Sequence, residues 1–206
     1  DELKITISGI DIELYHAPGE TNDQIFVWLP KHKSLMPGDN IYNTFPNLYT
    51  IRGTTHRNVS GWVDSLDHMR SFEPKYLFPS HTKPIEGEDA TQALTIYRDA
   101  IQYIHDQTIR LMNKGYYPDE IVEMIDLPYE LASSSLLKEF YGTVRWSVRS
   151  IYNGYLGWFD GNPSSLDPLG NTVEAQRIAS LAGGKENLFK SLEKAVAIED
   201  MQWALQ

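Results

Sequence analysis

The side chains that could bind a metal or act as an acid or base are few in this sequence. Cysteine is absent, which excludes thiolate metal sites, disulfides and thiol nucleophiles, so any metal must be held by His, Asp or Glu. The six histidines form no His-x-His pair and no His-Glu-x-x-His pair. The sequence therefore predicts at most one part of a metal site.

Three short stretches each place a metal-capable side chain in a loop beside a predicted strand. They are residues 17–24 (Ala-Pro-Gly-Glu-Thr-Asn-Asp-Gln), 37–40 (Pro-Gly-Asp-Asn) and 79–82 (Pro-Ser-His-Thr). Loops at strand ends are where a rigid sheet presents ligands. For any one stretch a structural interpretation is favoured, as a turn, a polar loop tip or a helix cap. Their order along the chain, with a carboxylate, then Gly-Asp, then Ser-His, is more informative than any one stretch.

The elements that must position these side chains differ between the two parts of the chain. Short runs rich in Ile and Leu, broken by Gly and Pro, predict strands at 3–8, 10–16, 25–29, 34–36 and 76–78, and one helix at 59–71. From residue 89 the apolar residues recur at steps of three and four. This spacing predicts helices ending near Gly115, starting at Pro118, and spanning 136–155, 173–181 and 186 onward. The predicted fold class is α+β, with a mixed half over 1–88 and an all-α half over 89–206.

Composition and charge exclude several classes of protein. Apolar residues make up 41% of the 206 residues and charged residues 22%, as in ordinary globular domains. The net charge of −10 argues against a nucleic-acid partner, since no basic patch is visible in the sequence. No run of about 18 apolar residues is present, so no membrane span is predicted. The chain opens on Asp1 and not on Met, and we expect this start to be a cut end.

The three stretches, in this order, resemble the second half of the metallo-β-lactamase fold. A narrower resemblance rests on residues 47–53 (Asn-Leu-Tyr-Thr-Ile-Arg-Gly), which follow the Asp-Asn pair at 39–40. Residues 97–108 and above all 155–163 (Tyr-Leu-Gly-Trp-Phe-Asp-Gly-Asn-Pro) extend it into the helical half. Together they look like the alkyl sulfatases typified by bacterial dodecyl-sulfate hydrolases.

This resemblance implies a fold and an assembly. It makes residues 1–88 the C-terminal half of a metallo-β-lactamase αββα sandwich. Residues 89–206 become an all-α dimerisation domain, so a homodimer is expected. The resemblance also suggests an exported bacterial enzyme, periplasmic or secreted, although the sequence itself does not constrain the compartment.

The resemblance also implies zinc-dependent hydrolysis of alkyl sulfate esters, with two Zn2+ ions in the intact site. Carried over residue by residue, it makes Asp23 and His81 ligands of one zinc and Asp39 the bridging ligand, with Asp39 and His81 at the catalytic centre. Asn47 and Arg52 match the positions that grip the sulfate oxygens, and an Arg presents a planar fork of donors suited to such a group.

Three departures from the family pattern keep other interpretations open. Both acidic ligand positions carry Asp where the family places Glu, and Trp146 stands where some members have His. The first metal motif of the superfamily, His-x-His-x-Asp-His, is absent, so we expect a missing amino-terminal segment and an inactive isolated chain. The alternatives are another hydrolase of the superfamily, such as a lactonase or phosphodiesterase, or a non-catalytic dimerisation fragment. Attack of water at sulfur and attack at carbon are both compatible with the sequence.

Overall fold

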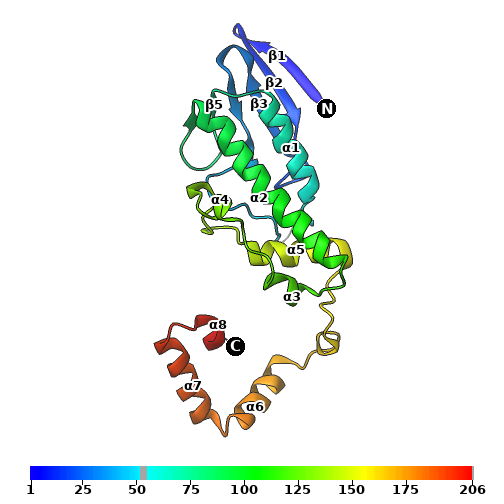
Figure 1. Cartoon of the computed structure of the whole chain (residues 1–206), viewed down its shortest axis with the longest axis vertical. Helices are drawn as coiled ribbons and strands as arrows, with labels where there is room; N and C mark the ends of the chain where they lie inside the picture. The colour runs from blue at the N-terminus through cyan, green and yellow to red at the C-terminus, as the bar shows by residue number, and fades with distance from the viewer. Residues whose placement is uncertain (52–54, 206) are drawn as a thin grey trace. The chain divides into compact units, whose positions relative to one another are not determined.

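The structure is a computed structural model that describes residues 1–51 and 55–205. The chain forms two compact units, Asp1–Asp160 and Gly161–Gln206 (Figure 1). The first unit holds a six-stranded sheet and helices, and the second is helical, which confirms the α+β fold class. The domain boundary at residues 88 and 89 stays a prediction. Within the described part of the chain, no helix combines the length and the apolar character that crossing a membrane requires.

The sheet follows the chain from one edge to the other, in the order β1-β2-β3-β4-β5-β6. The strands are β1 (Glu2–Ile7), β2 (Ile10–His16), β3 (Ile25–Leu29), β4 (Ser34–Met36), β5 (Tyr76–Leu77) and β6 (Ile85–Glu86). The first five were predicted within a residue or two, and β6 was not. Neighbours are antiparallel except β4 and β5, which are parallel.

The hairpin between β1 and β2 illustrates how local sequence sets the register. Ser8 and Gly9 are the two turn residues, and both have positive φ angles, 52° and 81°. A two-residue turn of this kind matches the twist of the flanking strands. Ile7 therefore pairs with Ile10, and the pairing continues without a bulge to Glu2 opposite Tyr15.

Sheet topology brings the three chemically interesting loops to the same edge. Strand β2 runs in the same direction as β4, because both are antiparallel to β3, and β5 is parallel to β4. The loops that follow β2, β4 and β5 therefore leave the sheet at one side. These loops contain residues 17–24, 37–40 and 79–82, the stretches selected from the sequence.

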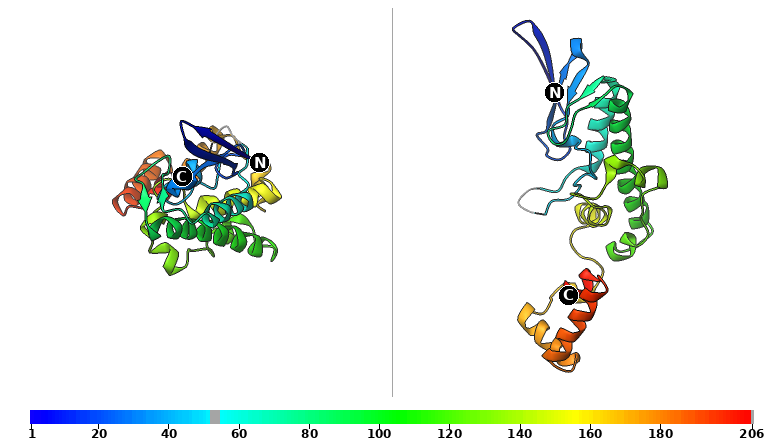
Figure 2. Two further views of the ribbon diagram at one scale, coloured as in Figure 1. Left: turned by 90° about the horizontal axis from the view of Figure 1, so that it is seen from above. Right: turned by 90° about the vertical axis from the view of Figure 1, so that its left-hand side faces the viewer.

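Helices α1 (Val59–Ser71) and α2 (Glu88–Met112) cover one face of this sheet (Figure 2). The helix predicted at 59–71 is confirmed in full, and it begins at an Asn58 cap whose side chain accepts a hydrogen bond from the amide of Gly61. Its apolar side, including Trp62 and Leu66, packs in a core with Phe26 and Leu35 of the sheet. Helices α3 (Pro118–Val122), α4 (Tyr129–Ala132) and α5 (Val144–Leu156) complete the first unit.

The prediction of a single long helix over 136–155 is wrong for the first part of this range. The chain makes a short 3-10 turn at Ser135–Leu137, runs without helical structure through residue 143, and begins α5 only at Val144. Thr143 caps α5 by accepting a hydrogen bond from the amide of Trp146. Residues 138–142 instead hydrogen-bond to a distant loop, and these tertiary contacts outweigh the helical pattern of the apolar residues.

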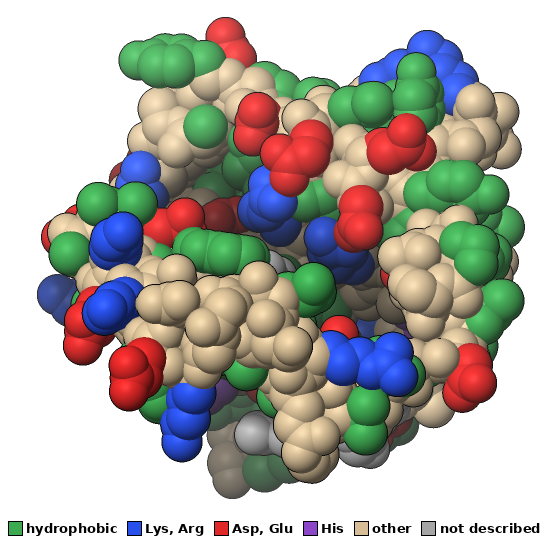
Figure 3. Space-filling view, turned by 90° about the horizontal axis from the view of Figure 1, so that it is seen from below, with side chains coloured by type: hydrophobic (Ala, Val, Ile, Leu, Met, Phe, Trp, Pro, Cys, Tyr) green, Lys and Arg blue, Asp and Glu red, His purple; other side chains and the backbone are tan. Residues whose placement is uncertain are grey.

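The second unit contains α6 (Asn171–Leu181), α7 (Lys185–Ala197) and α8 (Met201–Leu205). The helices predicted here are confirmed, with Gly183 and Gly184 between the first two and a break at 198–200 that was not predicted. Large apolar side chains of this unit lie exposed, among them Leu181, Phe189, Trp203 and Leu205. Hydrophobic side chains are visible on the surface in the space-filling view (Figure 3).

One buried side chain ties two of the site loops together. Asn40 is completely buried, its Nδ2 donates to the carbonyl of Ala17 at 2.8 Å, and its Oδ1 accepts from the amide of Glu20 at 3.2 Å. The carbonyl of Asn40 also accepts from the indole Nε1 of Trp62 at 3.1 Å. A β-carbon at Gly19 would lie 2.1 Å from Asn40 Oδ1, so only glycine allows this approach.

Replacing Asn40 should therefore be costly. We expect Asn40→Ala to lower the free energy of unfolding by about 3 kcal/mol, because it leaves a buried carbonyl and an amide without partners. Urea unfolding of the chain measures this loss. Asn187→Ala is the matched control, since Asn187 lies exposed on α7 and should change stability by less than about 0.5 kcal/mol. Equal stability of the two variants would contradict this role of Asn40.

Candidate metal and anion site

Asp39 and His81 meet at the edge of the sheet where β4 and β5 end. Asp39 lies in the 3-10 turn Gly38–Asn40, and His81 follows β5. The imidazole Nε2 of His81 is 3.4 Å from Asp39 Oδ1. Among the described residues, Asp39 Oδ1 is buried without a hydrogen-bond partner. A buried carboxylate oxygen without a donor is an atom that a bound cation would satisfy.

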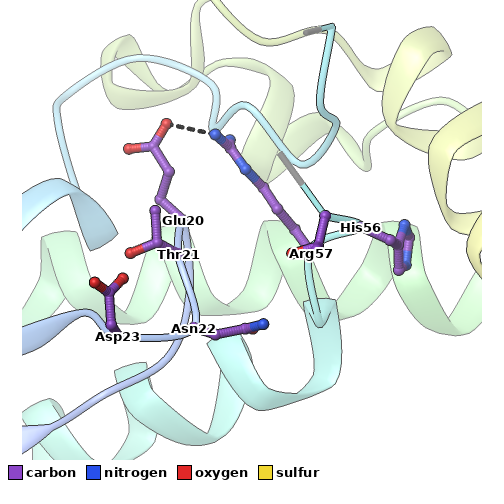
Figure 4. Close-up of a pocket in the computed structure, with 7 residues that line it drawn as sticks. Glu20, Thr21, Asn22, Asp23, His56 and Arg57 are labelled. Carbon is purple, nitrogen blue, oxygen red and sulfur yellow. Dashed lines mark hydrogen bonds and ion pairs between the residues drawn. The ribbon is translucent and has the colours of Figure 1, made fainter. Parts of the chain in front are cut away.

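Glu20 faces this pair from the loop after β2. Its amide is fixed by Asn40, and its carboxylate makes an ion pair with Arg57, with Nη2 and Oε1 2.9 Å apart (Figure 4). Burial raises the pKa of Glu20 above its ordinary value; the charge of Arg57 opposes this rise, and the charge of Asp39 adds to it. His81 also acts on the Glu20 carboxyl and lowers its pKa. Glu20 is thus close enough to Asp39 and His81 to share their electrostatic environment.

Asp23 occupies a different position from the one expected for a ligand of the same metal. Its side chain is exposed, and a hydrogen bond from Thr21 lowers the pKa of its carboxyl. In Figure 4 the Asp23 carboxylate lies apart from the ion pair that Glu20 forms with Arg57. The structure brings Asp39 and His81 together and does not bring Asp23 to them. Within the described part of the chain, no three His, Asp or Glu side chains are grouped closely enough to hold a metal ion.

Asn47 lies in a buried loop without regular structure, residues 42–49, and most of its polar atoms are engaged. Its amide donates to the hydroxyl of Tyr42 at 2.7 Å, and its carbonyl accepts from the guanidinium of Arg57. Its Oδ1 accepts from the amide of Tyr49 at 3.4 Å. Among the hydrogen bonds between described residues, none uses the side-chain amide nitrogen of Asn47, which is a donor suited to an anion. Arg52, the second predicted anion-binding residue, lies outside the described residues.

A shallow pocket of about 220 Å3 opens beside these groups. Its lining comes from two loops, with Glu20, Thr21, Asn22 and Asp23 from one and Thr55, His56 and Arg57 from the other. The ring of His56 points away from Glu20 and Arg57 in Figure 4, and burial lowers the pKa of His56 below its ordinary value. His56 therefore forms part of the pocket wall, and Arg57 brings a positive charge to it.

Glu20 and Arg57 are the residues that sequence reasoning missed. Glu20 lies in the stretch 17–24, which was already selected from the sequence. On the family resemblance, the other acidic residue of this stretch, Asp23, was predicted to be the metal ligand. The usable signal was Gly19, because a glycine directly before a carboxylate permits the close backbone approach that the structure shows at Asn40. No pattern in the sequence singles out Arg57, whose partners are 37 and 10 residues away.

Comparison with known proteins defines the class of protein first. Residues 2–81 match the metallo-beta-lactamase superfamily. Residues 117–206 match the family described as alkyl sulfatase dimerisation. Residues 2–81 therefore belong to the metallo-beta-lactamase superfamily, whose members bind metal ions, and residues 117–206 belong to the alkyl sulfatase dimerisation family.

Individual relatives agree with this assignment. A linear primary-alkylsulfatase from a Pseudomonas species is 43% identical over the whole of this chain, which covers 40% of that protein. An alkyl/aryl-sulfatase of Saccharomyces cerevisiae is 30% identical over 96% of the chain and 31% of that protein. The solved structure of a stereoselective inverting sec-alkylsulfatase from Pseudomonas superposes with a TM-score of 0.90 at 29% identity, over all of this chain and 33% of that one. The chain thus spans about a third of the length of these relatives.

Proposed function

We propose that the whole protein hydrolyses alkyl sulfate esters to an alcohol and sulfate. The observation that carries this proposal is the Asp39–His81 pair at the sheet edge, with Glu20 facing the pair and linked through Arg57 to the loop of Asn47. The pair offers metal ligands, and the loop offers donors to an anionic group. The names of the relatives, which are alkylsulfatases, support the same substrate class.

The metals in this proposal are two zinc ions. Asp39, His81 and one further carboxylate of this chain would hold them, together with a His-x-His-x-Asp-His segment outside the 206 residues. Bound zinc lowers the pKa of a water molecule and neutralises the anionic ester. The unsatisfied Asp39 Oδ1 supports a cation at this place.

The residues of this chain then position the substrate. Asn47 and Arg52 donate hydrogen bonds to the sulfate oxygens. Arg57 does not need to touch the substrate, because it holds the Glu20 carboxylate and the Asn47 carbonyl at the same time. Trp146, whose side chain is 53% exposed, would offer an apolar wall to the alkyl chain.

Activity toward dodecyl sulfate tests the proposed reaction. We expect the full-length protein to hydrolyse it and Arg52→Ala to lower kcat/KM by about 100-fold, the loss expected for a charge-assisted hydrogen bond. Arg110→Ala is the control, because Arg110 lies exposed on α2 and its Nε donates to the neighbouring Gln107 Oε1. Unchanged kcat/KM in Arg52→Ala would contradict the anion-binding role. Hydrolysis of a lactone or a phosphodiester, and not of the sulfate, would favour the alternative hydrolases.

Metal content decides between the two candidate carboxylates. The family resemblance favours Asp23, and the geometry favours Glu20, whose carboxyl is influenced by the charges of Asp39 and His81. We expect Glu20→Gln to lower the zinc content of the full-length protein, measured by mass spectrometry, by about one ion per chain, and Asp23→Asn to leave it unchanged. The reverse result would assign the ligand to Asp23. A full zinc content in both variants would exclude both residues.

We also propose a homodimer. The dimerisation family matched by residues 117–206 and the exposed apolar side chains of α6–α8 support it. Light scattering of the full-length protein should give twice the mass of one chain at micromolar concentration. A monomer would contradict this proposal, and a dimer without any hydrolysis would favour a purely oligomeric role.

A further inference from the structure

The loop 42–49 is buried although it has no regular secondary structure. Phe45, Asn47 and Leu48 are at most 6% exposed. Buried backbone groups need hydrogen-bond partners, and a loop cannot supply all of them from within. The hydrogen-bond partners of this loop therefore identify the segments that hold it in its conformation.

Many of those partners come from residues 138–142, about 90 positions further along the chain. The amide of Phe45 donates to the carbonyl of Lys138 at 2.9 Å, and the amide of Gly142 donates to the carbonyl of Phe45 at 3.2 Å. The hydroxyl of Thr44 donates to the same Lys138 carbonyl at 2.5 Å. The hydroxyl of Tyr49 donates to the carbonyl of Tyr141 at 3.0 Å. The two ends of the loop are thus fixed by one segment.

Close packing restricts this contact to a glycine. A β-carbon at Gly142 would lie 2.0 Å from the carbonyl oxygen of Pro46 and 2.8 Å from that of Phe45. These are backbone atoms of the loop, so they cannot rotate aside as a side chain would. Gly142 has no positive φ angle, and the requirement for glycine is therefore one of space.

Helix α5, which follows residues 138–142, contacts both the loop 42–49 and the segment 55–57 that lines the pocket. The ring of Trp146 meets that of Tyr49 edge to face, with centroids 5.4 Å apart. A β-carbon at Gly154 would lie 2.0 Å from Nε2 of His56, so the imidazole rests directly on the helix backbone. His56 immediately precedes Arg57, the residue that holds the Asn47 carbonyl. Residues 138–154 thus contact the Asn47 loop and the segment that carries Arg57.

We propose that residues 138–142, with Gly142 at the point of closest approach, are a positioning clamp that holds loop 42–49 in its anion-binding shape. The clamp acts through the loop, because residues 138–142 make all the contacts described for them with loop residues, and none of these contacts requires the substrate. The proposal rests on the proposed function, in which Asn47 binds the sulfate group. It assigns a role in substrate binding to a segment outside the metallo-beta-lactamase match, which ends at residue 81.

Gly142→Ala in the full-length protein tests the clamp by two measurements. Amide hydrogen exchange of Phe45 should become at least about tenfold faster, since the added methyl group displaces the carbonyls of Phe45 and Pro46. KM for dodecyl sulfate should rise by about tenfold while kcat stays within about twofold, as expected when substrate binding alone is weakened. Zinc content should stay unchanged.

Two further variants serve as a substitute for Gly142→Ala and as its control. Tyr49→Phe removes the hydroxyl that donates to the Tyr141 carbonyl and that also interacts with Thr143. It should raise KM by about threefold, so it replaces Gly142→Ala if that variant does not fold. Gly170→Ala is the control, because a β-carbon there meets no atom within 4 Å and its φ of −62° suits alanine. It should change neither exchange nor KM.

The possible outcomes distinguish a failure of the clamp proposal from a failure of the proposed function. Faster exchange with unchanged kinetics would overturn the positioning role, and so would unchanged exchange of Phe45 in Gly142→Ala. A fall in kcat with KM constant would also overturn it. If the wild-type protein hydrolysed no sulfate ester, the proposed function would fail, and the exchange of Phe45 alone would then decide whether the clamp holds the loop.

Discussion

The arrangement of the site depends on one buried amide, the side chain of Asn40. By bonding the Ala17 carbonyl and the Glu20 amide, it holds the loop after β2 against the turn after β4. Sheet topology brings these loops to one edge, and this contact fastens them to each other. A β-carbon at residue 19 would prevent it. The carboxylates of Glu20 and Asp39 are consequently held near each other by backbone geometry and not by attraction.

Two carboxylates held close together repel, and the surrounding charges determine how far this is offset. Burial and the charge of Asp39 both raise the pKa of Glu20, while Arg57 and His81 lower it. Breaking a largely buried ion pair such as Glu20–Arg57 leaves an uncompensated charge, which costs about 3–5 kcal/mol when the site is dry. Arg57 also holds the carbonyl of Asn47, so the same guanidinium links the acidic groups to the anion-binding loop. A divalent cation at Asp39 would relieve the remaining repulsion.

The sequence predicted the strands and their loops because both depend on local pattern. Alternating apolar runs and Gly-Pro breaks located five strands, and the edge where their loops meet follows from the order of the strands. Asp39 and His81 were predicted together because the order of the three stretches resembles that of the metallo-β-lactamase fold. The choice of Asp23 over Glu20 depends on how the eight-residue loop between β2 and β3 bends, and that bend is set by Gly19 and Asn40. Arg57 was missed because its partners are distant in sequence.

The error over residues 136–155 has a different cause. Their apolar spacing suits a helix, and α5 does form over the second half. The first half does not join the helix, because its carbonyls and amides satisfy groups of a buried loop and helix formation would leave those groups unsatisfied. The spacing of apolar residues predicts which side chains are buried. It does not predict which backbone groups must hydrogen-bond to a loop that is distant in the sequence. The boundary between the sheet-containing half and the helical half of the sequence is therefore not a boundary of the site, because the helical half shapes the loop on which anion binding would depend.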